Sequence, residues 1–145
     1  MIKCSLAAIL AAFVLASCTK NPTTETLIDE TVTKKVVYQI SAAKDYTAPI
    51  YNNMQTDLKL TVGVASTKTG DYTKLWDTTI AGHLRSFPQS NEQIEIEKTF
   101  QLVESTEQLQ VSYYIRYNDN GQLEQVASFK PVAKGTMLFQ ERISL

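Results

Sequence analysis

The chain has 145 residues, with 14 Lys and Arg against 15 Asp and Glu, and its formal net charge is −1. This length suits one domain, and the near-neutral charge excludes a general nucleic-acid-binding protein, which needs a clustered basic surface. One His and two Cys leave few metal ligands, so we expect no metal and no other cofactor.

The N-terminal region begins with a single basic residue, Lys3, followed by an apolar run of eleven residues from Leu6 to Ala16. A run of this length suits the core of a signal peptide, which has about 7–15 residues, whereas a membrane-spanning helix needs about 20. The run ends in the sequence LASC at residues 15–18.

The LASC sequence resembles the lipobox of bacterial lipoprotein precursors. This resemblance implies that residues 1–17 are a signal peptide, that the Cys18 thiol takes a diacylglycerol, and that Cys18 becomes the first residue of the mature chain. The acyl chains on Cys18, palmitate among them, would then attach the protein to a membrane. No Asp follows Cys18 directly, which by the same resemblance favours the outer membrane of the cell envelope. A plain secretory signal peptide cut elsewhere is the alternative.

Processing at Cys18 would remove Cys4 and cap Cys18 with lipid, so the mature domain would contain no disulfide. Residues 18–33 are rich in Thr and contain no aromatic residue. We interpret them as a flexible tether with a span of about 20 Å, which holds a domain of residues 34–145 just off the membrane. The alternative is that Leu27, Ile28 and Val32 already belong to the first strand.

Beyond the tether, apolar residues recur at every second position, which is typical of strands with one face on a core and one in water. The alternation runs through residues 36–40, 58–64, 76–80, 94–100, 109–117 and 137–143. No window predicts an amphipathic helix.

The turn residues support this interpretation. Asn120–Gly121 is the strongest short hairpin signal, because a type I′ turn needs positive φ at both central residues. We therefore predict that residues 109–117 pair with residues 122–129. A second, weaker turn is predicted around residues 68–71.

These elements predict an all-β protein, an antiparallel β-sandwich of about seven strands. The spacing resembles an immunoglobulin or fibronectin-like domain at the level of architecture alone. Trp76 falls on the third strand, where such a domain carries a Trp, but the two Cys of an antibody-type domain are missing. A closed barrel or a jelly roll is the alternative.

Few residues invite a catalytic or metal-binding interpretation. His83 could act as a general base, but no Ser or Cys stands at a recognisable motif spacing, so we interpret His83 as a loop residue. Among Glu92, Glu95 and Glu97, the last two share the solvent face of a predicted strand, where nothing would raise a pKa for acid–base work.

Residues 119–121, with Glu124 nearby, faintly resemble a calcium-binding loop. The full EF-hand pattern is absent, and the hairpin turn explains these residues.

The tyrosines are the more useful candidates for function. By alternation, Tyr114 and Arg116 point away from the core, Tyr46 and Tyr51 lie in one loop, and Tyr72 lies near a turn. Exposed aromatic rings stack on sugar rings or on partner side chains, so we interpret these five residues as a candidate binding surface. The alternative is that they only form cross-strand pairs on the sheet surface.

We therefore expect a lipid-anchored, non-enzymatic domain of the bacterial envelope that binds a glycan, a partner protein or another envelope component. A structural or assembly subunit of a surface complex is the second hypothesis, and a hydrolase with a dispersed site is the third. A deep polar pocket around His83 would favour the hydrolase. A flat aromatic patch would favour binding, and an open sheet edge would favour assembly by strand addition.

The lipobox predicts the effect of Cys18→Ala. This variant should remain an unlipidated, uncut precursor, because only the Cys thiol can take the lipid. Mass spectrometry of the mature N-terminus provides the measurement. An unmodified N-terminus at another residue of the wild-type protein would contradict the lipoprotein interpretation.

Overall fold

The structure is a computed structural model that describes residues 29–145. The predicted signal peptide and residues 18–28 of the predicted tether lie outside the described residues. The described chain forms seven strands and two 3-10 helices: β1 (Thr31–Ser41), η1 (Pro49–Tyr51), β2 (Gln55–Ser66), β3 (Tyr72–His83), η2 (Leu84–Ser86), β4 (Ile94–Val103), β5 (Glu107–Asp119), β6 (Gln122–Pro131) and β7 (Leu138–Ser144). The predicted all-β class is confirmed.

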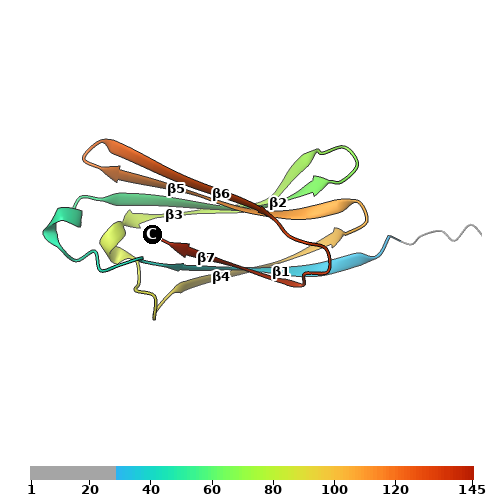
Figure 1. The fold of residues 1–145 in the computed structure, drawn as a ribbon, viewed down its shortest axis with the longest axis horizontal. Coiled ribbons are helices and arrows are strands. Elements are labelled where there is room, and N and C mark those ends of the chain that lie inside the picture. The colour runs from blue at the N-terminus through green and yellow to red at the C-terminus, as the bar shows by residue number, and fades with distance from the viewer. Residues whose placement is uncertain (1–28) are drawn as a thin grey trace, which may run out of the picture.

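The strands form two sheets that pack face to face as an immunoglobulin-like sandwich (Figure 1). One sheet has the order β4-β1-β7, and the other has the order β3-β2-β5-β6. The pairs are antiparallel as predicted, except that β7 runs parallel to β1. The exception arises because the chain crosses from one sheet to the other between β6 and β7, and so reaches β1 in the same direction.

The first strand begins earlier than the predicted boundary at residue 34. β1 starts at Thr31, which pairs with Val103 of β4. Val32 lies opposite Leu102 and packs against the core, so it belongs to the first strand. The ladder with β4 therefore orders the last three residues of the segment that the sequence predicts as a tether.

The hairpin between β5 and β6 has the predicted turn. Asp119 pairs with Gln122, which leaves Asn120 and Gly121 as a two-residue loop. Both loop residues have positive φ, at 50° for Asn120 and 90° for Gly121. These are the signs of φ that a type I′ turn demands, and they set the register of the whole hairpin.

Tyr38 joins the two sheets at the centre of the core. Its side chain is fully buried, and its hydroxyl donates to the carbonyl oxygen of Thr61 at 2.9 Å and to that of Ser112 at 3.3 Å. Thr61 and Ser112 are partners in the β2–β5 ladder, so one hydroxyl from β1 reaches two strands of the opposite sheet. Burial, and next the nearby Glu141 carboxylate, raise the pKa of Tyr38, which keeps the hydroxyl protonated as a donor.

Charged side chains close the two long sides of the sandwich. Glu141 of β7 is buried, and both of its carboxylate oxygens accept from Lys130 Nζ of β6, at 2.8 and 2.9 Å. On the other side, Lys98 Nζ of β4 lies 5.4 Å from the ring centroid of Trp76 in β3. Each contact connects an edge strand of one sheet to an edge strand of the other.

The hydroxyl of Tyr38 predicts a specific loss of stability. Tyr38→Phe should lower the free energy of unfolding by about 1 kcal/mol, because the ring stays packed while a buried hydrogen-bond donor is lost. Tyr38→Ala should lower it by about 3–5 kcal/mol, since the ring is removed as well. Urea unfolding measures both values. Equal stability of Tyr38→Phe and the wild type would contradict a role for the hydroxyl.

Candidate functional site

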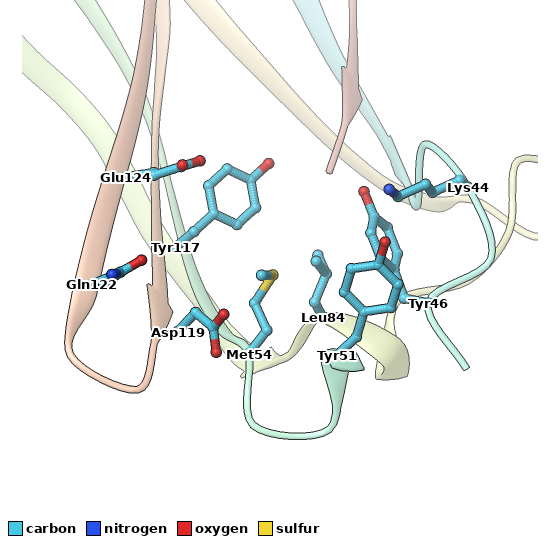
Figure 2. A pocket seen from close by; sticks show the side chains of 9 residues that line it. All are labelled: Lys44, Tyr46, Tyr51, Met54, Leu84, Tyr117, Asp119, Gln122 and Glu124. Carbon is cyan, nitrogen blue, oxygen red and sulfur yellow. The ribbon is translucent and has the colours of Figure 1, made fainter. Parts of the chain in front are cut away.

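A pocket with a volume of about 250 Å³ opens at one end of the sandwich. It lies between the β5–β6 hairpin and the loop that joins β1 to β2 (Figure 2). We call it the end pocket, and nine residues line it: Lys44, Tyr46, Tyr51, Met54, Leu84, Tyr117, Asp119, Gln122 and Glu124.

The loop wall of the end pocket is fixed through Leu145, which follows β7. The Tyr46 hydroxyl donates to the Leu145 carbonyl oxygen at 2.8 Å, and the Ala43 backbone N–H donates to the same oxygen at 2.7 Å. The Leu145 N–H in turn donates to the Ser41 carbonyl at 2.9 Å. Tyr46 is buried in this position, so its ring is a rigid part of the wall.

Two tyrosines and a lysine form the polar and aromatic surface of this wall. The rings of Tyr46 and Tyr51 meet edge to face, with centroids 5.0 Å apart and an interplanar angle of 88°. Lys44 Nζ lies 5.5 Å from the Tyr46 centroid and 5.0 Å from the Tyr51 centroid. A hydrogen bond with Tyr51 raises the pKa of Lys44, so this wall carries a positive charge at neutral pH.

The hairpin provides the opposite wall. Tyr117 of β5 and Glu124 of β6 are register partners, and both side chains point into the pocket (Figure 2). Burial is the main cause that raises the pKa of Tyr117, so its hydroxyl stays neutral. Asp119 adds a second carboxylate at the end of β5. Within the described residues, neither Asp119 nor Glu124 forms a salt bridge.

The floor of the end pocket is apolar. Leu84 of η2 is buried, and its N–H donates to the Met54 carbonyl at 2.9 Å. The side chains of Leu84 and Met54 lie between the two walls (Figure 2). Next to the lining residues Met54 and Asp119, Asn53 Nδ2 of the loop lies 3.5 Å from Asn120 Oδ1 of the hairpin turn. The two walls are thus linked by side chains as well as by the core.

The five residues of the predicted binding surface lie in two places. Tyr46 and Tyr51 line the end pocket, whereas Tyr72, Tyr114 and Arg116 lie on the outer face of the four-stranded sheet. The five residues therefore form two separate groups and not the single binding surface that the sequence predicts.

The outer group is partly engaged in structural contacts. Arg116 Nε donates to Asp57 Oδ2 at 3.0 Å, so its charge is paired. The Tyr72 ring covers Gly63, where an added Cβ would clash with the ring. Tyr114 is half-buried and borders a shallow depression of about 320 Å³ together with Phe129. This depression is more open to solvent than the end pocket.

The residues considered for catalysis are dispersed. His83 is exposed at the end of β3, and it lines a shallow depression with Asp57 and small or amide neighbours, at a site separate from the end pocket. Glu95 and Glu97 are exposed on the outer face of the three-stranded sheet, as predicted, and Glu97 pairs with Lys35 at 2.6 Å. In the part of the chain that the structure describes, no group of three or more His, Cys, Asp or Glu could hold a metal ion.

Sequence reasoning missed most of the hairpin wall. Alternation correctly places Tyr117 on the inner side of its strand, but it does not show that the opposite sheet stops short of that position. Lys44 carries no motif in the sequence. The sequence pattern predicts only a hairpin turn with a faint resemblance to a calcium-binding loop around Asp119 and Glu124, whereas the structure places both carboxylates in the end pocket.

No protein-family model matches the chain, and no curated protein is similar to it in sequence. Over residues 29–145, no helix is long and apolar enough to cross a membrane.

The two faces of β5 predict different effects of neighbouring substitutions. Tyr113 lies opposite Leu60 and packs against the core, whereas Tyr114 lies opposite Lys59 on the outer face. Tyr113→Ala should lower the free energy of unfolding by about 2–3 kcal/mol, somewhat less than for a fully buried ring. Tyr114→Ala should lower it by about 1 kcal/mol or less. Thermal and urea unfolding compare the two, and a larger loss at Tyr114 would contradict this register.

Proposed function

We propose that this protein is a lipid-anchored, non-catalytic binding domain of the bacterial cell envelope, and that the end pocket binds a sugar unit of a glycan. One observation carries the proposal. The Tyr46–Tyr51 pair and Lys44 stand on one wall, Asp119 and Glu124 stand on the other, and an apolar floor lies between them (Figure 2).

This arrangement matches the surface of a pyranose ring. The C–H faces of a sugar ring are apolar and stack on aromatic rings, while its hydroxyl groups lie at the edge. Carboxylates such as Asp119 and Glu124 accept hydrogen bonds from hydroxyls, and the Lys44 ammonium donates to them. Ligand pockets combine an apolar lining with a few placed polar groups in this way.

The charges of the end pocket narrow the class of sugar. One cation, Lys44, faces two carboxylates, Asp119 and Glu124, so the lining is net negative. A neutral hexose or an N-acetylhexosamine fits this balance, whereas the carboxylate of a uronic acid would be repelled. Glycoside hydrolases use a pair of carboxylates as acid and as nucleophile or base, so hydrolysis at Asp119 and Glu124 is the second candidate function of the end pocket.

The position of the end pocket suits a membrane-anchored domain. The N-terminal end of β1 lies at the opposite end of the sandwich from η1 and the β5–β6 turn, which flank the pocket (Figure 1). With lipid on Cys18 and a short segment before Thr31, the pocket would face away from the membrane surface. The proposed place is the outer membrane, as the residues after Cys18 favour.

Glycan binding by the full-length chain in detergent tests this proposal. Titration calorimetry with neutral hexoses, N-acetylhexosamines and uronic acids should show binding of a neutral sugar and weaker binding of its uronic acid. Tyr51→Ala and Glu124→Gln should each weaken binding by about tenfold, the size of a lost aromatic or charge-assisted contact.

Matched controls lie elsewhere on the surface. Tyr114→Ala and Glu95→Gln change the same residue types outside the end pocket and should leave the affinity unchanged. The proposal is wrong if no sugar binds. It is also wrong if Tyr114→Ala weakens binding while Tyr51→Ala does not, because the ligand would then lie on the outer sheet face.

A further inference from the structure

β6 is an exposed edge strand with apolar side chains on both of its faces. Among residues 29–145, its one strand partner is β5. Leu123 and Phe129 on its outer side are 58% and 60% exposed, and Val126 on its inner side is 46% exposed. A strand with free backbone groups and exposed apolar side chains is a ready site for addition of another strand.

The other edge strands carry devices that discourage such pairing. β3 is interrupted by a bulge opposite Val62 and Gly63, and it carries Lys74 and Asp77. β4 presents Glu95, Glu97 and Lys98, and β7 has only seven residues. In β6, the residues from Leu123 to Pro131 form a regular ladder with β5 and include two charges, Glu124 and Lys130. β6 nevertheless has more exposed large apolar side chains than the other edge strands of the described chain.

The hairpin fixes which residues of β6 face the open edge. Alternate residues of an antiparallel ladder direct both N–H and C=O to the same neighbour. The Val132 N–H donates to the Leu109 carbonyl at 2.8 Å at the end of this ladder, so even-numbered residues face β5. The backbone groups of Leu123, Gln125, Ala127 and Phe129 consequently point to the open edge. The backbone nitrogen of Pro131 also points to the open edge, so the missing N–H of Pro131 removes no hydrogen bond to β5.

We propose that β6 pairs antiparallel with β6 of a second copy of this chain, about a two-fold axis at Ala127. This register aligns the strand from Leu123 to Pro131 with itself and joins the two four-stranded sheets into one continuous sheet. It places Ala127 opposite Ala127, and it places Glu124 opposite Lys130 of the second copy.

The direction of the backbone N–H and C=O groups allows several antiparallel registers between two copies of β6, and charge and shape select this one. Glu124 has no salt bridge within the described residues, and Lys130, half exposed, can contact it while remaining bonded to Glu141. Because of the two-fold symmetry, the contact between Glu124 of one copy and Lys130 of the other occurs twice in the dimer. On the outer face, Phe129 comes to lie diagonally across from Leu123 and Ala127 of the second copy, which covers the most exposed apolar side chains of the strand. The two oxygens of Glu124 can serve this contact and a ligand in the end pocket together.

Substitution at the symmetry axis tests the proposal. In the full-length chain with Cys4→Ser and Cys18→Ser, the particle mass in detergent is measured by light scattering, and the chain should be a dimer. Ala127→Lys should be monomeric, as should Ala127→Asp, because each sets like charges directly opposite one another. An equal mixture of the two variants should restore the dimer. Gln125→Lys, which faces Phe129 of the second copy, should remain a dimer.

The register is tested separately by disulfide formation in the same chain. Val126→Cys and Ser128→Cys are opposite each other across the proposed pair, with Cα atoms about 4.5 Å apart, which suits a disulfide. A mixture of these two variants should give a disulfide-linked dimer on oxidation, and each variant alone should not. A monomeric wild type, or equal cross-linking by each variant alone, would overturn the proposal.

Discussion

The end pocket depends on one backbone carbonyl, that of Leu145. This oxygen accepts from both the Tyr46 hydroxyl and the Ala43 N–H, and it is held in place because β7 lies parallel to β1. Without the crossover that brings β7 to β1, the loop carrying Lys44, Tyr46 and Tyr51 would lose both of these hydrogen bonds. The topology of the smaller sheet thus determines the shape of a site whose other wall comes from the larger sheet.

Much of the fold follows from short-range features of the sequence. Alternation of apolar residues predicts the strands, and Asn120–Gly121 predicts the hairpin and its register, because both effects are local in the chain. The parallel β1–β7 pair is not predicted, since it brings together residues about a hundred positions apart. The start of β1 at Thr31 is likewise decided by its partner β4, and residues 31–33 alone do not signal it.

The candidate site is less accessible to sequence reasoning than the fold. Tyr46 and Tyr51 can be singled out because they are aromatic residues in a predicted loop. Their relation to Tyr117 and Glu124 depends on where each sheet ends relative to the other, which no periodicity encodes. Tyr72, Tyr114 and Arg116 match the same compositional pattern, yet two of them are engaged in structural contacts. The Tyr72 ring covers Gly63, and Arg116 donates a hydrogen bond to Asp57.

The opposite placement of the N-terminal end of β1 and the end pocket has a mechanical consequence. A molecule held in the pocket and an anchor before Thr31 would pull on the domain from its two ends, along the direction of β1. The hydrogen bonds between β1 and β4 lie perpendicular to this direction, and the loop wall of the pocket follows β1 directly, so tension on that wall would run along the backbone of β1. A central strand held on both sides, by β4 and β7, is therefore well placed to transmit tension along the long axis of the sandwich without unravelling.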